Sequence, residues 1–295
     1  MAKILSRAAP WSPSRSRPPG RAVRRLSDGD TAALAELVGA DPVANVFVAA
    51  HLAAHGTAAG ASSGAEIVGM FDGDGRLMSA CWLGANVVPV EVPADHAQAY
   101  ADVIRHSRRR FASIFGPAEA TLAIFAELSG PAARDVRRAQ PLLAMEGSPA
   151  VAPDPLVRVT TADDFDTLAP ACVSMFEEEV GYSPVAGGSE NYYRRVRQLI
   201  DLGHSFARFG EDGEVVFKAE LGSVSPAASQ VQGVWVEPSH RGEGLSHGGM
   251  AAVVEHARRL APVVSLYVND YNYKARASYR RVGFEQVGTF ATVLF

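Results

Sequence analysis

Apolar residues recur at helical spacing near the start of the second half of the chain. Thr161 and Asp164 stand three positions apart, which is the pattern of a capping box, and apolar residues recur every three or four positions from Phe165 to Met175. A second segment, 191–203, places its apolar residues on one helix face and ends at a glycine. This pattern predicts a short strand followed by two helices.

The period then changes to two. The segment 205–224 alternates on either side of Asp212 and Gly213, which predicts a β-hairpin. The pattern further predicts a strand over 229–238, a helix with an apolar face from Met250 to Leu260, a strand over 263–269, a helix over 273–284 and a closing strand over 285–295. This half is therefore expected to run strand, two helices, hairpin, long strand, helix, strand, helix, strand.

A weak internal repeat organises the rest of the chain. Residues 22–38 and 156–173 share Val, Arg, a turn rich in Ser or Thr, Asp and a Leu-Ala pair. Two copies of one domain are therefore expected, with the boundary in the Pro-, Gly- and Ser-rich segment 147–155. The predicted organisation is an arm at 1–21, a first domain at 22–150 and a second domain at 151–295. The arm is rich in Pro, Ser and Arg, which predicts a disordered, solvated tail.

Composition narrows the class of protein. The chain has 295 residues, 47% of them hydrophobic and 20% charged, which is typical of globular domains. A net charge of -4 gives no electrostatic reason to expect a nucleic-acid partner.

The longest apolar runs are too short and interrupted to cross a bilayer, so we expect a cytoplasmic protein with no membrane partner. Cys81 and Cys172 lie far apart and are expected to be buried free thiols.

Glycines interrupt the predicted boundary between the strand 229–238 and the helix that follows it. The first turn of a helix has unpaired N–H groups, and glycines ahead of it let an anion approach that backbone. A P-loop is excluded because no Lys follows these glycines, and a dinucleotide fold is disfavoured because His247 stands at the third glycine position. The stretch still predicts a site for an anionic ligand.

Two motifs around this stretch resemble those of the GNAT (Gcn5-related) N-acetyltransferase family. The sequence RGEGLS, 241–246, resembles the family's R/Q-x-x-G-x-G/A loop, and 272–284 matches its N-x-x-A-x-x-x-Y-x-x-x-G-F pattern. The resemblance covers about 156–295, and the whole chain resembles tandem GNAT proteins of actinobacterial type whose leading domain has no assigned function. It implies an α/β (α+β) fold of two GNAT-like domains. Each would be a mixed, mostly antiparallel sheet flanked by helices, with a splayed central strand in the C-terminal one.

The resemblance also implies a reaction and the residues that carry it. It implies direct transfer of an acetyl group from acetyl-CoA, the co-substrate, to a primary amine, with no metal. The backbone of Val234, Trp235 and Val236 would pair with the pantetheine arm. The residues expected to line the pyrophosphate are Arg241, Gly242, Glu243, Gly244, Leu245, Ser246 and His247. Asn272 would contact the pantetheine or the loop, and the phenol of Tyr279 would protonate the departing CoA thiolate. The alternative for Tyr279 is a core aromatic.

This sequence departs from the family pattern at the expected position of the general base. Several family members carry a glutamate on the long strand, but the nearest residues here are Gln230 and Gln232, whose amides cannot take a proton from an ammonium. Glu178, in the acidic run 177–179, is one candidate, although such a run is also typical of a solvated face. Glu220 and His240 are further candidates.

The first half is expected to differ in function. Its comparable segment, 87–104, has the strand and the proline but no glycine loop, so we expect it not to bind CoA in the usual way and to cover the catalytic domain. The basic cluster 105–110 is either a phosphate-holding group or a solvated helix end. The leading hypothesis is an N-acetyltransferase, monomeric or homodimeric. The alternative is a catalytically weak acyl-CoA-binding sensor or interaction protein.

Overall fold

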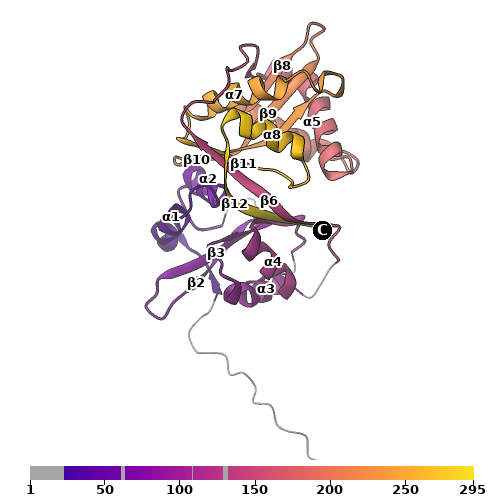
Figure 1. Ribbon diagram of the computed structural model, residues 1–295. Helices are drawn as coiled ribbons and strands as arrows, with labels where there is room; N and C mark the ends of the chain where they lie inside the picture. The colour runs from indigo at the N-terminus through magenta and orange to yellow at the C-terminus, as the bar shows by residue number, and fades with distance from the viewer. Residues whose placement is uncertain (1–22, 61–63, 108, 129–131) are drawn as a thin grey trace, which may run out of the picture.

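The computed structural model describes residues 23–60, 64–107, 109–128 and 132–295. The arm expected at 1–21 lies outside these residues. The described chain forms one twelve-stranded sheet, in the order β1-β2-β3-β4-β5-β12-β6-β11-β10-β9-β8-β7 (Figure 1). Most neighbouring strands are antiparallel, and the two parallel pairs are β4–β5 and β10–β11.

The second half contains the predicted elements in the predicted order. They are β7 (Arg158–Val159), α5 (Phe165–Val180), α6 (Glu190–Asp201), β8 (Ser205–Phe209), β9 (Val215–Val224), β10 (Ala228–Val236), α7 (Leu245–Ala257), β11 (Val263–Tyr267), α8 (Tyr273–Val282) and β12 (Glu285–Leu294). One detail differs from the pattern. Leu260 was expected on the buried face of a helix but is 47% exposed, because α7 ends at Ala257.

The first half repeats the same order. Its elements are β1 (Val23–Arg25), α1 (Thr31–Gly39), α2 (Val46–His55), β2 (Glu66–Phe71), β3 (Leu77–Leu83), β4 (Asn86–Val90), α3 (Ala97–His106), β5 (Ser113–Pro117), α4 (Ala118–Glu127) and β6 (Asp135–Glu146). This shared order confirms the tandem architecture.

The same side-chain arrangement starts each copy. Arg158 binds Asp164 through two nitrogens at 2.7 Å each, and Asp164 also accepts from the Thr161 N–H at 2.7 Å. Arg24 and Asp30 form the same bidentate pair at 2.8 and 2.7 Å, and a capping box is present in both copies. The repeat inferred from sequence is therefore a repeat of structure.

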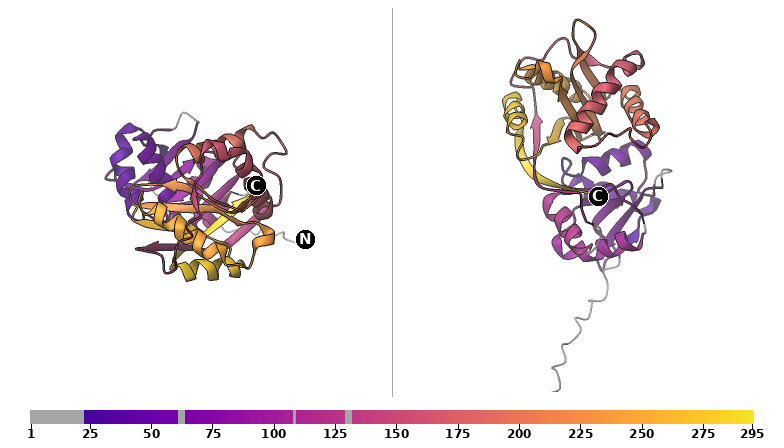
Figure 2. Two further views of the ribbon diagram at one scale, coloured as in Figure 1. Left: turned by 90° about the horizontal axis from the view of Figure 1, so that it is seen from above. Right: turned by 90° about the vertical axis from the view of Figure 1, so that its right-hand side faces the viewer.

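Two long strands join the halves. The first part of β6 pairs with the last part of β12, as in Val136 opposite Val293, and the last part of β6 pairs with β11, as in Leu143 opposite Leu266. The end of β12 in turn pairs with β5 of the first half. Each long strand thus completes the sheet of the other half, and Figure 2 shows both strands running between the stacked halves. The division at residue 150 stays a prediction, because the sheet is continuous across it.

Helices cover both faces of the sheet. In the second half, α7 and α8 pack on one face around Phe217 and Met250, and α5 and α6 pack on the other face around Cys172 and Trp235. Cys81 and Cys172 are buried and free, as expected. Among the described residues, no helix combines the length and apolar character needed to cross a membrane.

Candidate active site

A cleft opens where the two central strands of the second half separate. The strands β10 and β11 are paired in parallel only from Ala228 to Gln230, and β10 then shifts register against β9 between Gln232 and Trp235. Gly233 in this bulge has φ +60°, a left-handed conformation that favours glycine. The resulting cavity of about 300 Å³ is lined by Gln140, Met175, Glu178, Glu179, Val231, Gln232, Gly233, Val234, Trp235, Leu266, Tyr267, Val268, Asn269, Tyr271, Asn272 and Tyr279. The splay expected for this half is present.

The glycines after β10 serve two different purposes. Gly242 and Gly244 have φ +95° and +82°, and no heavy atom lies within 4 Å of the position that a Cβ would take at Gly242. This open, exposed loop leads directly into α7, whose first N–H groups are unpaired by helix geometry. Gly249, in contrast, lies against the ring of Phe217, where a Cβ would come within 2.7 Å. Gly249 is therefore required for helix–sheet packing, and only the loop glycines suit a ligand.

Two side chains of the loop, Arg241 and Ser246, form hydrogen bonds with other parts of the chain. Arg241 donates from Nε to the Val236 carbonyl at 3.0 Å and from Nη2 to both carboxylate oxygens of Glu178, at 2.9 and 2.7 Å. Ser246 shares a 3.0 Å hydrogen bond with Ser278 of α8. These contacts hold the loop against α5 and α8 and leave its backbone N–H groups open.

Tyr279 projects from α8 into the cleft. Its side chain is buried, its ring lies 6.1 Å from that of Phe284, and its hydroxyl has no hydrogen-bond partner among the described residues. Burial raises the pKa of Tyr279, and the nearby Glu179 carboxylate raises it further. The phenol therefore stays protonated well into the alkaline range. Tyr279 belongs to the core cluster as well as the cleft, so the two interpretations of this residue are compatible.

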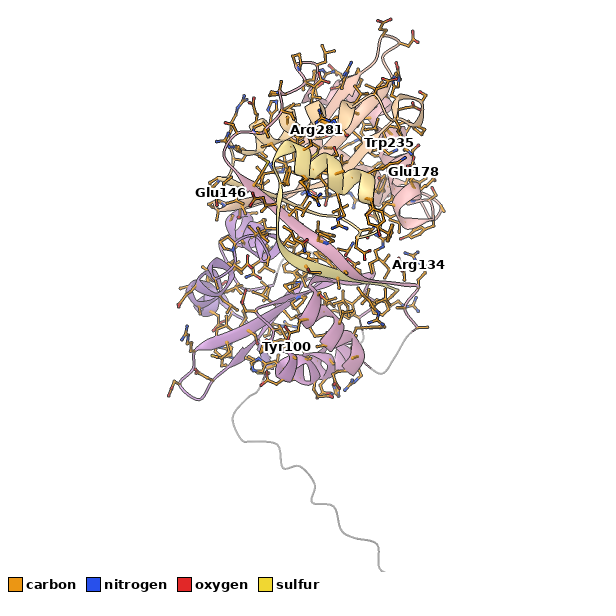
Figure 3. The ribbon with its side chains drawn as sticks, viewed as in Figure 1. Tyr100, Arg134, Glu146, Glu178, Trp235 and Arg281 are labelled. Atoms are coloured by element: carbon orange, nitrogen blue, oxygen red, sulfur yellow. The ribbon has the colours of Figure 1, made fainter. Side chains whose placement is uncertain are left out.

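Glu178 bridges three elements at the rim of the cleft. Besides Arg241, it accepts a 3.0 Å hydrogen bond from Nε1 of Trp235, and Figure 3 shows Glu178 and Trp235 next to each other. This arrangement ties α5 to β10 and to the glycine loop. Nη2 of Arg241 and Nε1 of Trp235 thus hold the carboxylate in place through charge-assisted hydrogen bonds.

Glu220 lies behind β10 and does not line the cleft. It is buried, its Oε1 is 2.6 Å from Nζ of the fully buried Lys218, and its Oε2 accepts from Gln232 at 3.4 Å. Lys218 also donates to the Gly233 carbonyl at 3.1 Å, so the Lys218–Glu220 pair stabilises the bulge of β10. Burial by itself would lower the pKa of Lys218, but the contacts with Glu220 and Cys172 together outweigh it, and the pKa is raised. Sequence reasoning missed Lys218, although two charged residues two positions apart in an apolar strand were a signal.

The long strand β6 brings further polar groups to the cleft. Arg137 of β6 donates from Nη2 to the backbone carbonyl of Glu179 at 2.7 Å and lies 3.5 Å from its carboxylate. Gln140 donates to Asn269 at 2.9 Å and accepts from Thr292 at 2.7 Å. Sequence reasoning missed Arg137 and Gln140, because no local pattern places β6 beside β11.

Asn272 begins α8. Its Oδ1 accepts a 3.1 Å hydrogen bond from the N–H of Ala275, which is the role of an N-cap, and its side chain also lines the cleft. His240, another candidate from sequence, is half-buried between two carboxylates, 3.3 Å from Glu243 and 3.8 Å from Glu214. It does not line the cleft.

The corresponding place in the first half has a different chemistry. β4 and β5 pair only at Asn86 and Val87 and then separate around a cavity of about 330 Å³. The charged side chains lining it are the carboxylates of Asp41, Glu91 and Glu119. Carboxylates repel phosphates, which favours the prediction that this half does not bind CoA in the usual way.

Comparisons with known proteins agree with this geometry. Residues 173–284 match the model of the acetyltransferase (GNAT) family. The chain carries a GNAT acetyltransferase domain. Residues 65–168 match a domain of unknown function, DUF4081, and no curated protein matches the chain.

Solved GNAT structures share the fold over nearly the whole chain. A GCN5-related N-acetyltransferase from Sphaerobacter thermophilus has 17% identity and a TM-score of 0.60, over 94% of this chain and 95% of its own. A tandem GNAT protein from the clavulanic acid biosynthesis pathway has 16% identity and a TM-score of 0.56, over 92% and 98%. A GNAT-family acetyltransferase from Colwellia psychrerythraea has 12% identity and a TM-score of 0.54, over 92% and 99%. At these identities the likeness shows the tandem GNAT fold, a fold that supports acyl transfer.

Proposed function

We propose that this GNAT protein is an N-acetyltransferase that moves an acetyl group from acetyl-CoA to a primary amine. The observation that carries the proposal is the cleft between β10 and β11, where a buried tyrosine faces the cavity near an open glycine loop. The same cleft holds exposed carboxylates at the end of α5, which favour a cationic acceptor.

Three parts of the chain would hold acetyl-CoA. The backbone at Gly242 to Gly244 and the first N–H groups of α7 suit the pyrophosphate. The unpaired edge of β10 from Val234 to Val236 suits the pantetheine amides, because an extended ligand can pair with a free strand edge. The carboxylate of Glu243 within this loop is exposed and lies 3.3 Å from Nδ1 of His240.

The reaction would proceed by attack of the amine on the thioester, followed by release of CoA. The neutral amine attacks the thioester carbonyl carbon and forms a C–N bond, and the carbonyl oxygen becomes an oxyanion. The oxyanion collapses and the C–S bond breaks, while Tyr279 gives its proton to the sulfur so that CoA leaves as a thiol. The proton released by the amine nitrogen restores the phenol through solvent.

An ammonium acceptor must first lose a proton, and Glu179 is the carboxylate we assign to this step. It lines the cleft and is close enough to Tyr279 to raise the pKa of that phenol. Of the two candidates from sequence, Glu178 already accepts hydrogen bonds from Arg241 and Trp235. Glu220 pairs with Lys218 at 2.6 Å and does not line the cleft. Glu179 lines the cleft, and its contact with Arg137 is longer, at 3.5 Å. The proposed roles of Glu178 and Glu220 are to position the loop and to support the bulge of β10.

The test is acetyl-CoA binding by calorimetry, with the wild-type protein and with Gly244→Glu. The wild type should bind one acetyl-CoA per chain, and the variant should lose this binding because the new carboxylate occupies and repels the phosphate position. Gly73→Glu is the matched control, since Gly73 has open space around it and lies in the distant first half. Thermal melting of each variant shows whether it is folded.

The outcomes separate the enzyme from its alternative. Acetylation of a panel of primary amines, followed as release of free CoA thiol, supports the transferase. Tight binding without transfer to any amine would favour the weak acyl-CoA sensor. Absence of binding by the folded wild type would overturn the proposal.

A further inference from the structure

A second cleft lies between the two halves, away from the acyl-transfer site. It has a volume of about 750 Å³ and shares no lining residue with the cleft between β10 and β11. Residues 82–86 of the β3–β4 turn form one part of its wall, Arg109 and Arg110 ahead of β5 form a second, and Arg195 of α6 forms a third. Its volume is in the range of small-molecule sites.

Its positive charge is not balanced by carboxylates. Arg110 is exposed and has no ion-pair partner among the described residues. Arg195 donates only to neutral oxygens, the side-chain carbonyl of Gln198 at 3.1 Å and the backbone carbonyl of Gly222 at 3.2 Å. Arg195 forms no direct ion pair among the described residues; burial lowers its pKa, and the charge of the Glu220 carboxylate offsets part of this effect.

The third arginine is only partly neutralised. Arg109 lies 2.6 Å from Glu66, but the same Glu66 oxygen is 2.5 Å from Arg25. One carboxylate therefore serves two guanidinium groups. The three arginines of the cleft leave an excess of positive charge.

The other polar groups of the wall are hydrogen-bond donors. The indole Nε1 of Trp82 has no partner among the described residues, and a Cβ at Gly84 would lie 2.5 Å from it, so the glycine keeps this N–H uncovered. Asn86 accepts from Ser113 at 2.9 Å through Oδ1, which leaves its amide nitrogen for a ligand. Donors from three arginines, an indole and an amide surround one space.

We propose that this cleft binds a small molecule through a phosphate group. Guanidinium groups bind phosphate oxygens through parallel, charge-assisted hydrogen bonds, and no carboxylate is among the residues that line this cleft. The arginines come from both halves, so the bound phosphate holds the first half against α6. This site is independent of acyl transfer and gives the first half a binding function of its own.

The test uses pyrophosphate as the probe and calorimetry on the full chain carrying Gly244→Glu, which removes the loop ahead of α7 as a competing phosphate site. We expect saturable binding of one pyrophosphate per chain. Arg110→Ala and Arg195→Ala should each weaken it about tenfold or more, as expected for the loss of a charged hydrogen bond. Arg194→Ala is the matched control, because Arg194 neighbours Arg195 but pairs with Glu190. In NMR spectra, the indole N–H signal of Trp82, assigned with Trp82→Phe, should shift on titration.

Several results would overturn the site. Absence of binding, equal weakening by Arg194→Ala, or an unmoved Trp82 signal would each exclude a specific phosphate site here. Binding of a DNA oligonucleotide but not of pyrophosphate would assign the surface to a nucleic acid instead. The readout does not depend on acetyl-CoA, so failure of the acyl-transfer proposal and failure of this one are distinguishable. Arg110 is exposed and unpaired, so its substitution leaves the fold intact.

Discussion

Tyr279 shows how one residue can serve both packing and chemistry. Its ring belongs to the core around α7 and α8, while its hydroxyl faces the cleft without a protein partner. A buried phenol near a carboxylate has a raised pKa and stays protonated at neutral pH. That property is what a proton donor to sulfur needs.

We predict that Tyr279→Phe lowers kcat for acetyl transfer about a hundredfold, the usual size of general acid catalysis, and leaves KM for acetyl-CoA nearly unchanged. Because the pKa of Tyr279 is raised, the donor remains protonated above the ordinary tyrosine value near 10, and wild-type kcat should not fall there for loss of this proton. Steady-state kinetics across pH measure both effects. Tyr273→Phe, at an exposed tyrosine on the same helix, is the control. An unchanged kcat in Tyr279→Phe would remove this residue from the mechanism.

Charged residues near the cleft depend on their partners as much as on their own chemistry. Glu178 and Glu220 are both carboxylates beside the transferase site, but Arg241 holds one and Lys218 holds the other. Breaking a buried ion pair by removing one partner leaves an uncompensated charge, which is costly. Loss of activity after substitution of Glu220 would therefore not by itself identify a base.

At the scale of elements, each copy begins with the same capping box, which an arginine of the preceding strand binds. A Ser or Thr two residues after the strand is the N-cap of the turn that follows, the Asp three positions later completes the capping box, and an Arg of the strand binds that Asp. The Arg158 guanidinium, together with hydrogen bonds from Thr161, lowers the pKa of Asp164 to about 2. The capping box thus connects strand and helix through one carboxylate.

We predict that Asp164→Asn lowers the free energy of unfolding by about 1 kcal/mol at pH 7, the usual contribution of a helix cap. The native pKa is lowered, so this contribution is complete above the ordinary aspartate value near 4 and is lost as pH falls through about 2. Urea unfolding at several pH values measures the difference. Asp163→Asn is the control, since Asp163 is exposed and outside the box. Equal effects of the two substitutions at neutral pH would contradict the assignment.

At the scale of the whole molecule, the two halves are joined because β6 of the first half pairs with β11, and β12 of the second half pairs with β5. The last part of β6 lies between β11 and β12, and its first part supplies Arg137 and Gln140 to the surroundings of the cleft. The first half therefore contributes directly to the surroundings of the cleft in the second half. A sheet that lacks one internal strand exposes two unpaired edges.

We predict that a fragment of residues 151–295 does not fold as a stable monomer, because β11 and β12 lose the strand between them. A fragment of residues 132–295 keeps β6 and should show a higher Tm and stronger acetyl-CoA binding. Thermal melting by circular dichroism and size-exclusion chromatography compare the two. Cooperative melting of the shorter fragment as a monomer, near the Tm of the intact chain, would show that β6 is dispensable.

The sequence by itself determined the features that depend on neighbouring residues. The strand and helix order, the capping box at Thr161 and Asp164, and the loop glycines before α7 all follow from short-range periodicity and backbone chemistry. The place of Tyr279 followed from a family motif of fixed spacing. These features could be predicted because both the cause and the effect lie within a few residues.

Only the tertiary structure decided which distant groups meet. Gln140 and Asn269 hydrogen-bond across β6 and β11, Glu178 is held by Arg241, and Arg110 faces the same cleft as Arg195. Such contacts depend on strand order and on the packing of the two halves, which no local period specifies. The charge of each residue is written in the sequence, but its partner, and with it its chemical role, depends on the fold.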